Sequence, residues 1–362
     1  MKFIHPLTSL RAFLAIWVLC RHWFYNYDGA DGVFFKLSFS TPIFDKGYLG
    51  VDGFFILSGF ILTYNYSRNG EVPSNYARFL LARIARIYPV HIICLLAAAG
   101  MILVKHFVMH RPAIGVDGNT GFAFLSNLVL MNSWFPGLSN GWNDVAWSVS
   151  AEWFAYLFFG VFLWIAPAKK HVKWLMLLPV LGLALVEWDG GRNQLSLPGS
   201  LWRLIPEFYL GVCLCRTRQM GGGQFLGKWG SLAAFALVVL TLFIGIDTLV
   251  VVSLALLIYS LSFSEDVATP AMSLPALIYL GEISYCIYMV QRIPQWIYSV
   301  ARKSSSIIYL LPVPVQVAIL LGMTILFAAL LHHLIENPMR TRINRLGKKG
   351  GVGQSPVKSA VT

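Results

Sequence analysis

The chain has 362 residues, of which 57% are hydrophobic and only 12% are charged. Soluble globular domains carry about 25% charged residues, so this composition excludes an ordinary soluble protein. The formal net charge of +12 is compatible with nucleic-acid binding, but Lys and Arg also gather in the cytoplasmic loops of membrane proteins. Because apolar runs recur along the whole sequence, we expect a polytopic membrane protein with no nucleic-acid partner.

About ten apolar segments are long enough to cross a bilayer as helices, so the expected fold class is an all-α polytopic membrane protein. The first segment holds Arg11, Arg21 and His22, and no small-residue cleavage site follows it. We therefore expect it to be a retained span rather than a signal peptide. The ten segments are residues 7–27, 47–67, 86–104, 145–166, 173–187, 200–216, 229–246, 248–264, 275–299 and 313–335.

The positively charged loops orient these segments. Arginine and lysine concentrate after the second, fourth, sixth and tenth segments, which places those loops and both termini in the cytoplasm. Residues 122–131 are apolar but too short to span, and we interpret them as a re-entrant or interfacial piece of an external loop, 105–144. We expect residues 1–346 to form one transmembrane domain and residues 347–362 to form a disordered cytoplasmic tail.

Charged residues inside a membrane are costly and usually indicate function. Arg11 and His22 lie eleven residues apart on the first segment, which places them on one helix face and about 16 Å apart. We expect Arg11 near the cytoplasmic end and His22 in the outer half of the membrane. Taken alone, the pair has a structural explanation as a snorkelling arginine and a hydrogen-bonded core histidine.

Two carboxylates are predicted at the depth of His22 on other segments. Asp52 lies about one turn into the second segment, where it could also cap a helix. Glu152 in the fourth segment shares a polar stripe with Ser148 and Tyr156, spaced four residues on either side of it. Three ionisable groups at one depth are hard to explain by packing. We therefore interpret His22, Asp52 and Glu152 as a catalytic site, with Glu152 as the preferred partner of His22.

The stretch before the third segment holds Arg78, Arg83 and Arg86. A positive-inside cluster is the ordinary explanation. The functional alternative is a phosphate clamp, because Arg83 and Arg86 are spaced to share a helix face and guanidinium groups bind phosphate oxygens in pairs.

Six motifs in a fixed order resemble the membrane-bound acyltransferase family 3, whose members O-acylate glycans and lipids. Each motif is weak alone, but the ordered set covers about residues 5–340. Gln291 departs from the pattern, since relatives usually have His there, and Asn337 often is Arg or Lys in relatives, with no expected catalytic consequence. The motifs are LTSLRAFLAIWVLCRHW, GYLGVDGFFILSGFIL, ARFLLARIARIYPVH, WSVSAEWFAYL, LGEISYCIYMVQ and IENPMR.

The resemblance implies an acyl-coenzyme A donor, most often acetyl-CoA, held from the cytoplasmic side by Arg83 and Arg86 with Arg11 on its path. It implies His22 as the catalytic residue. The implied acceptor is a hydroxyl of an exported or lipid-linked glycan, such as an exopolysaccharide or lipopolysaccharide, at the bacterial inner membrane. Ser148 and Tyr156 would hold Glu152 or bind this acceptor.

Two mechanisms and one rival function stay open at this point. Either His22 deprotonates the acceptor hydroxyl while Glu152 or Asp52 orients its ring, or His22 itself accepts the acyl group. A transporter of a glycan or anionic solute would use the same residues as a proton relay, although no internal repeat supports this. Thioester chemistry requires no metal and the five cysteines lack zinc-site spacing, so we expect no metal cofactor.

Overall fold

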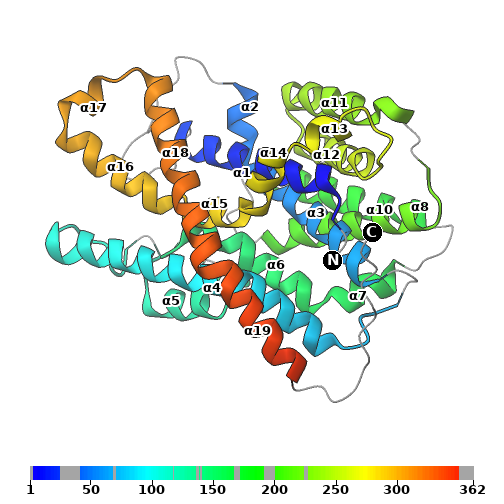
Figure 1. Ribbon diagram of the computed structural model, residues 1–362, viewed down its shortest axis with the longest axis horizontal. Coiled ribbons are helices and arrows are strands. Elements are labelled where there is room, and N and C mark those ends of the chain that lie inside the picture. The colour runs from blue at the N-terminus through cyan, green and yellow to red at the C-terminus, as the bar shows by residue number, and fades with distance from the viewer. Residues whose placement is uncertain are drawn as a thin grey trace.

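The computed structural model describes residues 3–24, 41–67, 71–116, 118–135, 138, 141–166, 172–190, 200–223 and 227–349. Throughout these residues the chain forms helices joined by turns, and none of them lies in a strand (Figure 1). The all-α prediction is therefore confirmed for the described part of the chain. Most of the predicted cytoplasmic tail lies outside the described residues, but its first residues continue the last helix to Lys349.

The predicted apolar segments coincide with helices. Three of them are divided: segment 145–166 into α6 and α7, segment 173–187 into α8 and α9, and segment 275–299 into α14, α15 and α16. The longer helices are α1 (His5–Phe24), α3 (Leu49–Tyr66), α4 (Tyr76–Leu103), α6 (Trp147–Leu157), α9 (Leu177–Gly190), α10 (Ser200–Gln219), α11 (Gly230–Ile244), α12 (Asp247–Leu261), α16 (Arg292–Ser304), α18 (Val313–Leu331) and α19 (Asn337–Lys349). The shorter ones are α2 (Pro42–Asp45), α5 (Gly121–Leu128), α7 (Phe159–Ile165), α8 (Val172–Leu175), α13 (Thr269–Met272), α14 (Pro275–Glu282), α15 (Ser284–Val290) and α17 (Ser306–Leu310).

Four helical stretches among the described residues are long and apolar enough to cross a membrane: Pro42–Tyr66, Tyr76–Val108, Gly227–Ile244 and Val313–Arg345. A fifth is obtained if α6, with the turn before it, and α7 form one span bent by 60°. Helices of this kind make the chain a membrane protein. The number of ten spans and the cytoplasmic position of both termini stay predictions.

Close approach of backbones joins α3 to its neighbours. A Cβ atom on Gly59 would collide with the carbonyl oxygen of Phe208 in α10, and one on Gly211 of α10 would collide with the carbonyl oxygen of Ile56. Because glycine has no side chain at these positions, the two helices pack with their backbones in contact. On its other side, α3 places Gly50 against Leu14 of α1. Helix α3, which contains most of the second motif, is therefore packed closely between α1 and α10.

The short apolar piece predicted at residues 122–131 is helix α5, which has eight residues and is too short to span. It packs against α4, where the Tyr88 hydroxyl donates to the Leu128 carbonyl at 3.0 Å and the His91 ring bonds the Asn127 carbonyl at 2.8 Å. Its position relative to the membrane surface stays a prediction.

The last transmembrane helix changes its winding near the end. A π-helical turn, His332–Glu336, separates α18 from α19, and the two helices form one nearly continuous rod that crosses α4 (Figure 1). Pro338 explains this position, because proline has no N–H to give to the carbonyl four residues before it. The turn packs against α4 close to Arg86.

Candidate active site

A partly open cavity of about 140 Å³ lies among α1, α3, α4, α6 and α15. Six of the eight residues that the sequence analysis assigned to the site line this cavity, and they come from three separate motifs. These six are Arg11, Arg83, Arg86, Ser148, Glu152 and Tyr156. The other two, His22 and Asp52, are not among the lining residues.

The cavity wall is rich in positive charge. Its lining contains three arginines and one carboxylate, Glu152. Arg83 exposes only 9% of its surface, and its Nη2 donates to the Tyr66 hydroxyl at 2.9 Å, yet its Nε has no hydrogen-bond partner. Burying a guanidinium N–H without a partner is costly, so this wall is suited to an anionic ligand.

Glu152 faces the Arg11 end of the cavity. It accepts a hydrogen bond from the Ser58 hydroxyl at 2.6 Å, and Arg11 and Tyr156 are its charged and polar neighbours. Because α3 runs antiparallel to α1, with Gly47 beside Trp17 and Gly50 beside Leu14, Ser58 lies toward the Arg11 end of α1. Glu152 therefore sits at the depth of Arg11.

The expected pairing of Glu152 with His22 is thus not what the structure shows. The prediction counted depth from the start of each helix. However, α6 follows a 3-10 turn, Asp144–Ala146, in which Val145 and Ala146 are buried but the Asp144 side chain is 38% exposed. Counting residues along each helix does not show which side chains meet across helices, because this depends on how the helices pack.

Asp52 belongs to a different cluster, between α3, α10 and α12. Its Oδ1 accepts from Arg203, at 2.7 Å from Nη2 and 3.0 Å from Nε, and both side chains are buried. Arg203 also lies 3.6 Å from carboxylate oxygens of Glu207 and Asp247, and Lys46 pairs with Asp247. The structure therefore separates Asp52 from His22 and gives it a buried arginine as its partner.

His22 bonds a glutamine. Its Nδ1 lies 2.6 Å from Oε1 of Gln291, whose own amide donates to the carbonyl of Tyr288 at 2.8 Å. An amide oxygen only accepts, so Nδ1 of His22 carries the proton and Nε2 is left as the basic nitrogen. Gln291, which departs from the motif of the resembled family, is thus the residue that orients His22.

Hydrogen bonds link His22 to a residue of the cavity lining. Tyr288 lines the cavity, and its hydroxyl accepts from Ser148 at 2.8 Å, which joins α15 to α6. The backbone carbonyl of Tyr288 accepts from Gln291, the partner of His22. Arg292 and Asp144, which form an ion pair (Nε to Oδ1 2.9 Å), are the nearby charges around His22.

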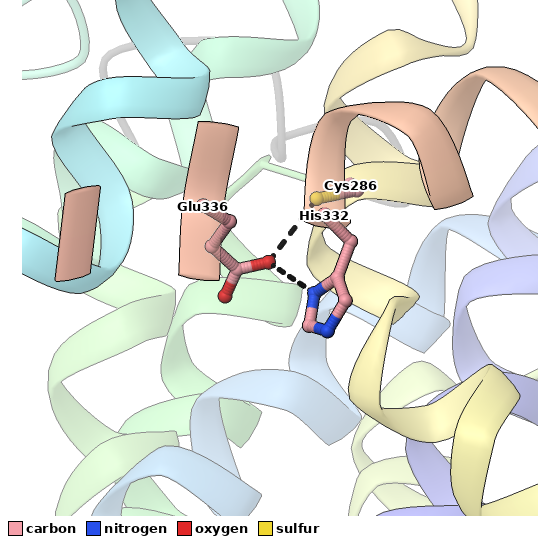
Figure 2. A group of neighbouring side chains, drawn as sticks. All are labelled: Cys286, His332 and Glu336. Carbon is pink, nitrogen blue, oxygen red and sulfur yellow. Dashed lines mark hydrogen bonds and ion pairs between the residues drawn. The ribbon is translucent and has the colours of Figure 1, made fainter. Parts of the chain in front are cut away.

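Arg86 has a carboxylate partner to which the sequence analysis gave no role. It forms an ion pair with Glu336 of the π-helical turn. Glu336 also approaches Cys286 and His332, and Figure 2 shows these three side chains pointing toward one another. Among the described residues, they form a group of potential metal ligands with all ligand atoms within 4.8 Å.

Sequence signals existed for some of the residues that were missed. Glu336 is the second residue of the last motif, and Arg203 and Glu207 stand four residues apart in a mostly apolar segment. Ser58 and Tyr288 lie in the second and fifth motifs, but their contacts at the cavity depend on how the helices pack.

Comparisons with known proteins identify the class to which the chain belongs. A family model described as an acyltransferase domain matches residues 4–333. Since this match covers nearly the whole chain, the protein belongs to this acyltransferase family, whose members transfer acyl groups other than aminoacyl groups.

Two known proteins are similar to parts of the chain. Acyltransferase MdmB of Streptomyces mycarofaciens is 32% identical over 167 residues, which are 45% of this chain and 40% of that protein. Protein 2 in picA locus of Rhizobium radiobacter is 28% identical over 149 residues, which are 37% of this chain and 68% of that protein. The chain thus matches less than half the length of MdmB. No solved structure is similar to it.

Proposed function

We propose that the protein moves an acyl group, most often acetyl, from cytoplasmic acyl-coenzyme A to a hydroxyl of an exported or lipid-linked glycan at the bacterial inner membrane. The observation that carries this proposal is the cavity in which Arg11, Arg83 and Arg86 gather, together with His22, whose partner Gln291 is hydrogen-bonded to a residue of the cavity lining. Guanidinium groups bind phosphate oxygens through paired, charge-assisted hydrogen bonds.

Only part of such a donor enters the cavity. Pockets for drug-sized ligands occupy about 300–1,000 Å³, whereas this cavity has about 140 Å³. In this proposal the adenosine end of coenzyme A stays outside the cavity, and its phosphates meet the arginines that line it.

His22 acts as the general base in this proposal. Its Nε2 takes the proton of the acceptor hydroxyl while the hydroxyl oxygen attacks the thioester carbonyl. The carbon–sulfur bond then breaks, and the departing thiolate of coenzyme A takes the proton from the imidazolium. Gln291 keeps the Nδ1 proton in place throughout, a role that carboxylates fill in other histidine sites.

The alternative mechanism, in which His22 accepts the acyl group, differs in its intermediate. Acyl-imidazole formation would leave labelled acyl on the protein when no acceptor is added. The transporter alternative has lost its support, because the family match assigns the chain to acyltransferases. Ser148 and Tyr156 keep their proposed roles, to hold Glu152 or to bind the acceptor, whereas Glu152 is now proposed to act at the Arg11 end of the cavity and not as the partner of His22.

Two measurements test the proposed function. Purified protein in detergent should release labelled coenzyme A from acetyl-CoA when an acceptor saccharide is present, and no release with any acyl-CoA would contradict the donor assignment. Mass spectrometry of surface glycans and lipids from a deletion strain should reveal a missing acyl mass. Unchanged glycan masses together with an altered lipid would show that the acceptor is a lipid.

A further inference from the structure

The last motif of the sequence, IENPMR, forms a buried hydrogen-bonded group beside the cavity (Figure 2). Glu336 is completely buried at the end of the π-helical turn. One of its carboxylate oxygens pairs with Arg86, and the other lies 2.8 Å from Nδ1 of His332 and 3.2 Å from the thiol of Cys286. Both oxygens of the carboxylate are therefore fully engaged.

The neighbours of Glu336 fix its position. The Asn337 amide donates to Nε2 of His332 at 2.8 Å, so the ring carries its proton on Nδ1 and donates it to Glu336. The S–H of Cys286 in α15 points to the same carboxylate oxygen (Figure 2). Three donors thus surround one carboxylate, an arrangement that keeps it charged and rigid.

Arg86 connects this group to the cavity. Its guanidinium lines the cavity and leaves 17% of the side chain exposed, while one of its nitrogens pairs with Glu336. A guanidinium has five N–H donors, and the ion pair uses one edge of the fork, which leaves others for a ligand. Arg86 also stacks against Tyr285 at 6.0 Å, so its orientation is held from two sides.

The ligand types of Cys286, His332 and Glu336 would also suit a divalent cation. The charges around Glu336 favour a role that does not involve a metal ion. Arg86 already balances the negative charge of Glu336, and a cation bound at the same carboxylate would lie beside a buried guanidinium. Asn337 furthermore occupies the second ring nitrogen of His332 as a donor. Cys286, His332 and Glu336 already have hydrogen-bond partners, so the group can hold Arg86 in place without a metal ion.

We propose that Glu336 is a positioning residue, which holds Arg86 in the orientation that binds the phosphate or thioester end of the donor. This inference rests on the proposed acyl-CoA function. It assigns a purpose to three consecutive residues of the motif: Glu336 anchors Arg86, Asn337 orients His332, and Pro338 causes the π turn that presents both side chains.

The test compares Glu336→Gln with wild type in a purified transfer assay with acetyl-CoA. We expect the donor KM to rise about tenfold or more, while kcat changes less than about twofold, because a remote binding contact is lost. Glu336→Asp keeps the charge and should restore part of the affinity. The matched control is Glu265→Gln, which removes an exposed carboxylate far from the described cavity and should change neither constant.

A double variant keeps the test decisive if Glu336→Gln folds poorly. Arg86→Met with Glu336→Gln removes both charges of the pair and should fold better than either single variant. Because Glu336 acts through Arg86, the donor KM of the double variant should equal that of Arg86→Met. A further rise in the double variant, or an unchanged KM in Glu336→Gln, would overturn the inference.

Two other results separate a failure of the inference about Glu336 from a failure of the proposed function. Stoichiometric zinc in the purified protein that is lost in Cys286→Ser would overturn the anchor and establish a metal site. Absence of any turnover by wild-type protein would defeat the proposed function itself. In that case coenzyme A binding, measured by calorimetry on wild type and Glu336→Gln, still decides the inference, since equal affinities would contradict it.

Discussion

The hydrogen bond between His22 and Gln291 decides which ring nitrogen of the histidine is basic. Sequence reasoning expected a carboxylate in this place, whereas the structure supplies an uncharged amide. A glutamine cannot take up a proton from the imidazole, so its contribution is to select the tautomer and to fix the ring. The nearest charges, Arg292 and Asp144, are already paired with each other.

Replacing Gln291 by methionine removes this acceptor while nearly preserving side-chain volume. We expect kcat for acyl transfer to fall about a hundredfold, because the wrong tautomer becomes accessible, while the donor KM changes little. Steady-state kinetics on purified protein measures both constants. Wild-type kcat in a well-folded Gln291→Met variant would show that the hydrogen bond does not orient a catalytic His22.

At the scale of elements, α6 determines where the carboxylate of the site lies. The helix follows a 3-10 turn, Asp144–Ala146, and bends by 60° where it meets α7. Its Glu152 lies beside Ser58 and Arg11, whereas His22 bonds Gln291. A sequence shows the polar stripe of a helix but not how the helix packs against its neighbours, which explains why sequence reasoning paired Glu152 with His22.

This separation predicts independent energetic effects. Glu152→Gln and Gln291→Met should lower kcat/KM by factors that multiply in the double variant, within about 0.5 kcal/mol, because they act at different ends of the cavity. The measurement is a double-mutant cycle in the transfer assay. A double loss far below the product would indicate that Glu152 and His22 work as one unit, as the sequence alone had led us to expect.

The cluster around Arg203 has the character of a structural element that holds α3, α10 and α12 together. Arg203→Met would leave Asp52, Glu207 and Asp247 without their shared cation, and we expect a loss of roughly 3–5 kcal/mol in the free energy of unfolding. Adding Asp52→Asn should recover part of this loss, since one buried negative charge disappears.

Thermal unfolding in detergent checks the stability, and transfer activity per folded molecule checks the role of Asp52. We expect Asp52→Asn alone to retain most of its activity. Loss of activity in a normally folded Asp52→Asn variant would show that Asp52 belongs to the catalytic site.

For the molecule as a whole, the apolar segments predicted most of the helices, since hydrophobic runs of sufficient length have few alternatives in a membrane protein. The division of residues 275–299 into α14, α15 and α16 escaped prediction. There, Gly281 packs against the backbone of Thr8 in α1, and the Ser284 hydroxyl bonds the Gly281 carbonyl, so tertiary contacts break a continuous apolar run. Only four or five stretches among the described residues are apolar enough to span unaided.

The candidate site was likewise only partly predictable from the sequence. The resemblance to an acyltransferase family indicated the residues, and six of them converge on one cavity. The partners that tune them, Gln291 for His22 and Glu336 for Arg86, come from segments more than 200 positions away in the chain. Such long-range pairings depend on packing, and no local sequence pattern predicts them.

The central claim is that the cavity arginines bind an acyl-CoA donor and that His22 transfers its acyl group. The most direct test measures transfer from labelled acetyl-CoA by purified wild type, Arg83→Ala and His22→Ala, with His5→Ala as an exposed histidine control on the same helix. The account predicts a raised donor KM with nearly constant kcat for Arg83→Ala, and a kcat lowered about 10²–10⁴-fold for His22→Ala. Wild-type kinetics in a folded His22→Ala variant would contradict it.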